Sequence, residues 1–271
     1  MISPLYGQLS PLRIPMKAGR APVSDSDAEA YLQAVEAADG QQLEQGVADA
    51  INSFVVGCKS DGIWSAIKAS CILAGARTLS GALVPLVGTA PTNFNFVSAD
   101  YNRETGLLGN RTSKYLACNR NNTADPQNSR HFSVFCSQAD TGTRTSSTRN
   151  FYLAAWDGNT GISGLHRFGT DGAFNIHIVG NGISSGDGSL AGFLGARRSA
   201  SNSVTYRVGS NNTNVTQTSV TPRSLNWLVF RSATGNYANA RQSFYSIGEN
   251  LELALLDTRV STLMTDLAAA I

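Results

Sequence analysis

The sequence predicts a mainly β protein: an antiparallel two-sheet sandwich with an extended N-terminal arm, a short N-terminal helical region and a C-terminal helix. Three observations predict this. Four of the eight prolines fall within the first 22 of 271 residues, and apolar residues then recur at helical spacing up to residue 74. From about Pro85 the chain becomes rich in Asn, Ser, Thr and Gly, with short apolar runs typical of strands between them.

Residues 1–24 are the expected arm. Proline is disfavoured both inside helices and inside sheets, so this segment should be extended. An extended segment cannot bury its own apolar side chains, and we expect them to dock on a partner chain, with packing on their own domain or simple disorder as the alternatives. These side chains are Ile2, Leu5, Tyr6, Leu9, Leu12 and Ile14.

Residues 25–80 are expected to form three short helices. Ser26 and Glu29 match a capping box at the start of the first, and Asp-Gly at 39–40 ends it. The second carries an apolar stripe over residues 43–58 and ends at Asp-Gly 61–62. The third is predicted from helical spacing of the apolar residues Ile63, Ile67, Cys71 and Ala74.

Residues 81–271 are expected to form the sandwich and its closing helix. Asp-Gly turn signals at residues 157–158, 171–172 and 187–188 separate several of the strands. Connections without a helical period favour an antiparallel arrangement, and apolar residues at helical spacing predict a helix from Leu253 to Ile271. The expected strands are Lys114–Cys118, His131–Ser137, Asn150–Trp156, Leu165–Phe168, Phe174–Val179, Ala191–Arg197, Val204–Val208, Leu225–Arg231 and Gln242–Ile247.

The charge balance argues against a nucleic-acid partner. Only 15% of residues are charged and the net charge is +2, divided as −2 over the first 80 residues and +4 over the remainder. No run of about 18 apolar residues is present, so no membrane insertion is expected. The N-terminus also lacks the pattern of a secretory signal peptide, which favours synthesis in a cytoplasm.

The four cysteines are expected to be buried free thiols. They are Cys58, Cys71, Cys118 and Cys136, and none forms a C-x-x-C pair. The alternative is a disulfide between Cys118 and Cys136, placed as neighbours on paired strands.

No residue pattern indicates an enzyme, a cofactor or a strong metal site. Glycoside hydrolysis usually needs two nearby carboxyl groups, yet no glutamate occurs between Glu104 and Glu249, and the aspartates there fall in turns. The three histidines match no metal-binding motif, although His166 and His177 can lie on neighbouring strands. A calcium ion held by Asp157, Asn159 and Thr160 is a weak alternative, because it would have one carboxylate.

Binding remains as the function that the residues allow. Aromatic rings offer faces on which sugars stack, and the Asn-, Ser- and Thr-rich loops offer hydrogen bonds. The candidate glycan contacts are Trp156, Asn159, Tyr206 and Tyr237.

Three segments carry a family resemblance. Residues 91–107 and 113–116, and the ending Phe-Tyr-Ser-Ile-Gly at 244–248 before a helix, resemble laminin-G-like, concanavalin A-like jelly rolls. The segment from Ala50 to Trp64 resembles phage virion proteins that join such a jelly roll to a helical N-terminal part. The Glu-x-Asp-x-Glu strand of sugar-cleaving relatives has no match.

The resemblance implies a non-enzymatic bacteriophage virion protein. The leading expectation is a tail fibre or receptor-binding protein that attaches to other virion proteins by its N-terminal region and displays a jelly roll that binds host-surface glycan. A homo-oligomer, with a trimer expected, follows from the same resemblance. The alternatives are a capsid decoration or baseplate-peripheral protein without a ligand, and a carbohydrate-active enzyme or lectin.

Overall fold

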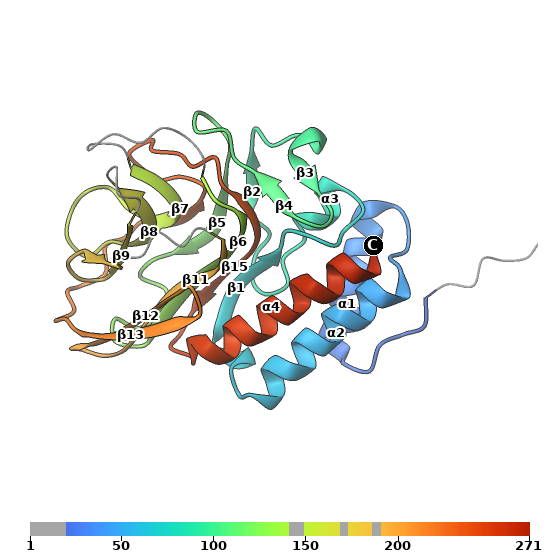
Figure 1. Ribbon diagram of the computed structural model, residues 1–271, viewed down its shortest axis with the longest axis horizontal. Coiled ribbons are helices and arrows are strands. Elements are labelled where there is room, and N and C mark those ends of the chain that lie inside the picture. The colour runs from blue at the N-terminus through green and yellow to red at the C-terminus, as the bar shows by residue number, and fades with distance from the viewer. Residues whose placement is uncertain (1–19, 141–148, 169–172, 186–190) are drawn as a thin grey trace, which may run out of the picture.

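The computed structural model describes residues 20–140, 149–168, 173–185 and 191–271 (Figure 1). The expected docking residues of the arm, from Ile2 to Ile14, lie outside these ranges, as do the turn signals at 171–172 and 187–188. Residues 20–24 lead without regular structure into the first helix.

Two antiparallel sheets pack face to face and confirm the expected jelly-roll sandwich. Sheet A comprises eight strands within the described ranges: β1 (Ile67–Ile72), β3 (Tyr101–Asn102), β4 (Gly106–Leu108), β6 (Arg130–Gln138), β11 (Gly192–Ala200), β12 (Ser203–Val208), β13 (Asn211–Thr216) and β15 (Arg241–Gly248). Its order is β13-β12-β11-β6-β15-β4-β3, and β1 also pairs with β15.

Sheet B lies opposite. It has seven strands in the same described part of the chain: β2 (Thr92–Phe94), β5 (Tyr115–Asn121), β7 (Arg149–Ala155), β8 (Ser163–Phe168), β9 (Phe174–Ile178), β10 (Ile183–Ser184) and β14 (Asn226–Val229). Its order is β10-β9-β8-β7-β14-β5-β2.

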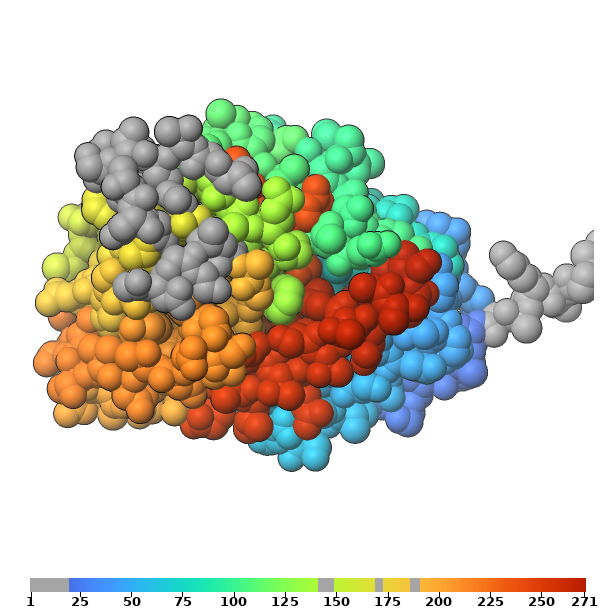
Figure 2. All heavy atoms as spheres, in the orientation of Figure 1, coloured from blue at the N-terminus to red at the C-terminus, as the bar shows by residue number. Residues whose placement is uncertain are grey.

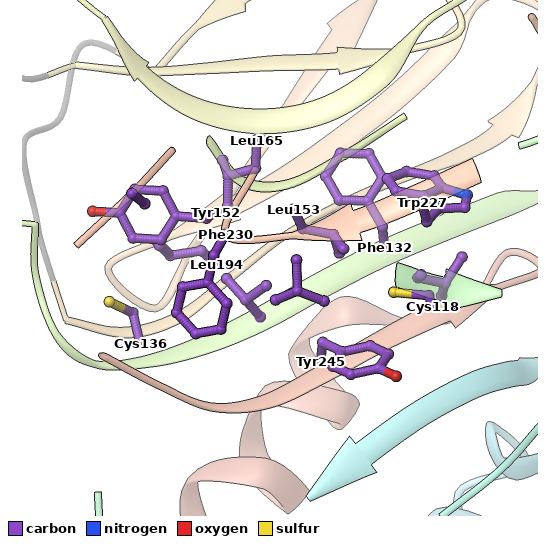
Figure 3. Close-up of a cluster of buried hydrophobic side chains, with 14 of the residues drawn as sticks. Cys118, Phe132, Cys136, Tyr152, Leu153, Leu165, Leu194, Trp227, Phe230 and Tyr245 are labelled. Atoms are coloured by element: carbon purple, nitrogen blue, oxygen red, sulfur yellow. The ribbon is translucent and has the colours of Figure 1, made fainter. Parts of the chain in front are cut away.

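The main core lies between the two sheets (Figure 3). Strand residues alternate between the two faces of a sheet, so every second side chain points into this layer. Aromatic rings fill much of it, with Phe132 and Trp227 in contact at 5.3 Å between ring centroids. Both rings are almost fully buried.

Three longer helices cover the outer face of sheet A (Figure 1). They are α1 (Ser26–Asp39), α2 (Gln45–Ser60) and α4 (Leu253–Ala270), and Figure 2 shows α4 lying between α2 and the β12–β13 edge. Phe54 of α2 packs edge-to-face on Phe244 of β15, with ring centroids 5.8 Å apart. The helices and sheet A therefore share one hydrophobic cluster. Shorter helical turns are η1 (Trp64–Ala66), α3 (Leu79–Ala82) and η2 (Ser98–Asp100).

The first two helices and the closing helix are confirmed, with one change at a helix start. The N-cap of α1 is Asp25, whose carboxylate accepts hydrogen bonds from the backbone N–H groups of Asp27 and Ala28. The expected capping box is therefore wrong, because Glu29 instead pairs with Arg20. Gly40 ends α1 in the left-handed conformation (φ +69°), as its sequence position predicts.

The third expected helix is wrong. Residues 67–72 form β1, which pairs antiparallel with β15. Ala69 and Cys71 face the core between the sheets, whereas Ile72 faces the helices, so both faces of β1 are buried. A strand buried on both faces has a nearly continuous apolar run, which periodicity cannot separate from a helix. The expected domain boundary at residue 80 consequently falls after the chain has already entered sheet A.

All nine expected strands are present, with ends within a few residues of those expected. The sequence did not reveal β1 or the short strands β2, β3, β4 and β10. It also did not reveal β13, a six-residue edge strand with no buried residue and hence no alternation of apolar and polar side chains.

The four cysteines are free and buried. The alternative of a disulfide between Cys118 and Cys136 is wrong, because their strands are not paired: β5 belongs to sheet B and β6 to sheet A. Burial raises the pKa of the Cys136 thiol to about 12, which makes it unreactive at neutral pH. None of the helices in the described ranges is both long and apolar enough to cross a bilayer.

Candidate functional site

Sheet B presents the face of the sandwich that the helices leave free. The helices pack on sheet A, where α4 lies against β11 and β12. On β8 and β9, Leu165 and Ile176 point into the core, so His166 and His177 point to the outer face. Trp156, which follows β7, joins them there: its ring centroid is 4.3 Å from that of His177 and 5.2 Å from that of His166.

A pocket of about 430 Å³ opens beside this aromatic cluster. Three loops and two aromatic side chains form it: the loop after β7, the loop after β9, the segment after β13 that contains Val220, and the rings of Trp156 and His177. Its remaining lining residues are Gly158, Asn159, Thr160, Gly161, Ile162, Gly180, Asn181, Gly182 and Val220. Every lining residue is uncharged at neutral pH, so the pocket suits a neutral polar ligand with an apolar side.

The two histidines are neutral at physiological pH. Burial lowers the pKa of His177 to about 4, and the nearby Arg149 guanidinium acts in the same direction. Burial and the neighbouring His177 lower the pKa of His166 well below its usual value. Their Nδ1 atoms are buried without a hydrogen-bond partner among the described residues. A neutral imidazole on the wall of the pocket can donate or accept one hydrogen bond.

Backbone strain shapes the pocket wall. Val179 adopts φ +47°, a left-handed conformation that β-branched residues rarely take. Its N–H donates to the Ile162 carbonyl at 3.0 Å, and its carbonyl accepts from the Val220 N–H at 2.8 Å. These bonds join three chain segments that line the pocket, and strain of this kind is common at functional sites.

A buried arginine anchors the loop after β9. Arg198 of β11 donates from Nη2 to the Gln217 side-chain oxygen at 2.9 Å, and Gln217 donates from Nε2 to the Asn181 carbonyl at 2.8 Å. The Arg198 side chain is completely buried. The position of Asn181 therefore depends on a residue in the opposite sheet.

The loop after β7 does not resemble a calcium site. The Asp157 carboxylate pairs with Arg223 and accepts the Asn159 backbone N–H at 3.1 Å. Nowhere in the described ranges do three His, Cys, Asp or Glu side chains gather around a common point. Asp157 thus acts here as a turn-stabilising residue.

The structure brings together two of the four candidate glycan contacts. Trp156 and Asn159 line the same pocket. Tyr206 packs in the main core between the sheets and does not line the pocket. Trp156 is itself only 9% exposed, so a small part of its ring forms the pocket wall. Tyr237 lies in a separate aromatic cluster with Tyr115.

Sequence reasoning missed most of the pocket. Asn181 and Gly182 belong to polar loops that resemble many others in this chain, and Thr160 was named only in the calcium alternative. His177 had one usable signal, because its expected strand lay next to that of His166. A Cβ on Gly182 would lie 2.8 Å from Cε1 of His177, so only glycine fits there without movement of the ring.

Comparisons with known proteins give a distant likeness in fold. No protein-family model and no curated protein matches the sequence. Among solved structures, the chain is similar to the botulinum neurotoxin serotype D binding domain, with 11% identity, a TM-score of 0.49, and coverage of 73% of this chain and 51% of that one. It is also similar to mouse laminin alpha1 domains LG4-5, with 14% identity, a TM-score of 0.36, and coverage of 63% and 47%.

A third similar structure is the Trypanosoma rangeli sialidase, with 11% identity, a TM-score of 0.47, and coverage of 81% of this chain and 39% of that one. The chain thus spans about half, or less, of the length of these structures. At this distance the likeness concerns only the β-sandwich fold, in which the chain is similar to laminin-G-like and neurotoxin-binding-domain sandwiches.

Proposed function

We propose that this chain is a non-enzymatic carbohydrate-binding protein that holds a neutral sugar in the pocket beside Trp156 and His177. The observation that carries the proposal is the composition of the pocket: an aromatic wall, an imidazole and the exposed side chains of Asn159, Thr160 and Asn181. Sugars offer hydroxyl groups for such donors and acceptors and C–H faces for aromatic rings. No described lining residue is an Asp or Glu, which supports binding over hydrolysis.

A glycan array probed with the labelled full chain tests the proposal, followed by calorimetric titration of the best neutral ligand. Changing Asn159 and Asn181 together to Ala removes two exposed amides, and we expect binding to weaken at least about fivefold. Asn211→Ala on β13 is the matched control, because that side chain is exposed on the other sheet. Release of reducing sugars, or equal binding by all three proteins, would contradict the proposal.

Gly182→Ala tests the pocket by adding a methyl group to it, whereas the Asn substitutions remove hydrogen-bonding groups from it. The new methyl group forces either the His177 ring or the loop to move, because the two cannot share the space. We expect weaker binding at nearly unchanged thermal stability, since Gly182 is exposed. Unchanged affinity in calorimetry would show that the ligand binds elsewhere.

We further propose that the protein is displayed on a bacteriophage particle, as a tail fibre or receptor-binding subunit and as a homo-oligomer, a trimer by the family resemblance. The support is that resemblance and the apolar arm of residues 1–24. A capsid decoration protein is the second candidate from the same resemblance. In that case the protein would bind assembled heads and leave adsorption to the host unchanged when deleted.

Deleting residues 2–19 tests the attachment. The deletion keeps Arg20, whose guanidinium pairs with Glu29 and Glu36 at 2.8 and 2.6 Å, so the helices retain their N-terminal contacts. We expect folded protein that no longer enters particles. Normal copy number of the shortened chain in purified virions would contradict attachment by the arm, and antibody labelling in electron microscopy separates tail from head.

A further inference from the structure

A second aromatic cluster surrounds Arg231, just beyond β14. The Arg231 guanidinium carbon lies 4.5 Å from the Tyr115 ring centroid and 5.1 Å from that of Tyr237. Phe94 stacks in parallel on Tyr115, with centroids 4.3 Å apart and 3° between the planes. Two groups this close to one ring cannot occupy the same face, so Phe94 and Arg231 lie on opposite sides of Tyr115.

Arg231 lacks an ionic partner within the ranges that the structure describes. Its Nε is buried without a hydrogen-bond partner among the described residues, and no carboxylate in those ranges forms an ion pair with it. Several other arginines have carboxylate partners, as Arg207 has in Asp257 at 2.7 Å, and the buried Arg198 donates to carbonyl oxygens. The two Nη groups, which are not among the buried unpartnered atoms, remain as paired N–H donors for a planar anion.

The backbone holds this arginine in place. Phe230 directly before it is fully buried and has φ +69°, which turns the chain at the end of β14. Arg231 then pairs with Tyr237 through an isolated β-bridge. A strained, buried residue beside this cation is consistent with a binding role.

The cluster shares a face with the pocket. Leu116 and Cys118 of β5 point into the core, so Tyr115 points to the outer side of sheet B, where the pocket also lies. Only β14 separates β5 from β7, about 10 Å across the sheet. Leu116 and Leu153 both pair with Val229, so Trp156 lies about 10 Å further along the strand direction, away from Tyr115. The loop after β14 links the two places, because the Ala233 N–H donates to the Trp156 carbonyl at 2.9 Å.

We propose that Arg231, Tyr115, Tyr237 and Phe94 form a second binding site, for the carboxylate of an acidic sugar. The guanidinium binds the carboxylate through two N–H donors, and the Phe94 ring, 37% exposed, packs on the sugar ring. The inference rests on the proposed carbohydrate function for the ligand class, while the site itself is separate from the pocket. A free inorganic anion would use the same guanidinium without needing Phe94.

The experiment follows the Arg Nε–H signals of the ¹⁵N-labelled full chain by NMR during titration. The probes are methyl β-D-glucuronide, methyl β-D-glucoside and sodium acetate, and Arg231→Lys identifies the Arg231 signal. We expect the glucuronide to shift this signal at concentrations at least about tenfold lower than acetate does, while the glucoside leaves it unchanged. Phe94→Ala should weaken glucuronide binding and leave the acetate response unchanged.

Arg231→Gln should weaken glucuronide binding at least about tenfold. Arg259→Gln on α4 is the matched control, since it removes the same charge from the helical side of the protein. Equal glucuronide affinity of Arg231→Gln and the parent protein would overturn the site, and equal potency of acetate and glucuronide would overturn its assignment to a sugar.

Glycan binding in the pocket is measured in the same proteins with the best neutral array ligand. Loss of the glucuronide response with intact pocket binding in Arg231→Gln supports two separate sites. If the pocket binds no sugar while the glucuronide still shifts Arg231, the proposed pocket function fails and the second site stands. If the pocket binds the neutral sugar but the glucuronide does not shift the Arg231 signal, the second site is rejected and the proposed pocket function stands.

Discussion

Lowering the pH from 7 to 4 is expected to reduce the free energy of unfolding by several kcal/mol, because the fold buries neutral histidines. Burial lowers the pKa of both His131 and His177 to about 4, against about 6.5 in an unfolded chain. Between these values the unfolded state binds more protons than the folded state, so stability falls as the pH falls. Each of the two histidines accounts for about 3 kcal/mol once the pH is below 4.

His131 shows why the neutral form is preferred. Its Nδ1 donates to the Glu249 carbonyl at 2.5 Å and its Nε2 accepts from the Ser246 hydroxyl at 2.7 Å, so a neutral ring satisfies both atoms. The ring is 1% exposed. Burial lowers the pKa of His131 and outweighs the hydrogen bond to the Glu249 carbonyl and the Asp125 carboxylate, both of which favour the charged form, while Arg120 acts in the same direction as burial.

Carboxylates do not account for the loss of stability above pH 4.5. Glu29 pairs with Arg20, and its pKa is lowered from 4.5 to about 2. Stability from such a group is present above the unfolded pKa of 4.5 and is lost as the pH falls through 2. The loss of stability between pH 6.5 and 4.5 is therefore assigned to the protonation of histidines in the unfolded state.

Urea unfolding at pH 7.5, 6.5, 5.5 and 4.5 measures this dependence. His166→Leu removes one titrating group from a nearly buried position, and we expect a shallower loss of stability with falling pH than in the parent protein. Phe168→Leu is the matched control, because it changes the same ring cluster without changing a titrating group. A midpoint that stays constant from pH 7.5 to 4.5 would refute the explanation.

Replacing Arg198 by Ala is expected to destabilise the protein by about 3 kcal/mol or more. The side chain is completely buried and binds carbonyl oxygens instead of a carboxylate. Nε donates to the Ile178 carbonyl at 3.0 Å, and Nη1 donates to the Ser201 and Gln217 carbonyls at 3.1 and 2.7 Å. Alanine would leave these buried acceptors without donors, and each costs about 1–3 kcal/mol.

The same substitution should weaken sugar binding in the pocket. Without Arg198, the Gln217 side chain loses its partner, and the hydrogen bond from Gln217 to the Asn181 carbonyl loses its support. Arg198→Lys should restore only part of the stability, because an ammonium group cannot place donors where the guanidinium fork does.

Guanidinium chloride unfolding at pH 7.5 gives the change in stability, and calorimetry with the neutral array ligand gives the change in affinity. Arg197→Ala is the neighbouring control: its ion pair is with Glu252, whose side chain is 53% exposed, so a loss of at most about 1 kcal/mol is expected. Equal losses in the Arg197 and Arg198 variants would contradict the anchoring role of Arg198.

Part of the site was accessible from the sequence. Trp156 was a candidate because aromatic rings offer faces for sugars, and Asn159 because Asn-rich loops offer hydrogen bonds. Tyr206 was a candidate for the same reason as Trp156, yet its side chain points into the core between the sheets, because the direction of a strand side chain depends on the register with neighbouring strands. No pattern in the sequence marks Arg231 as a binding residue, because its proposed role depends on contact with the ring of Tyr115, more than 100 residues earlier in the chain.

The sequence by itself determined the local elements: the apolar spacing of α4, the stop of α1 at Gly40, and the β-rich composition after Pro85. Only the tertiary structure decided that residues 67–72 form a strand, since its pairing with β15 outweighs the helical spacing of Ile67 and Cys71. It also decided which aromatic rings meet on the outer face of sheet B. The physical reason is that periodicity and turn residues act over a few positions, whereas strand order and register arise from burial between segments far apart in the chain.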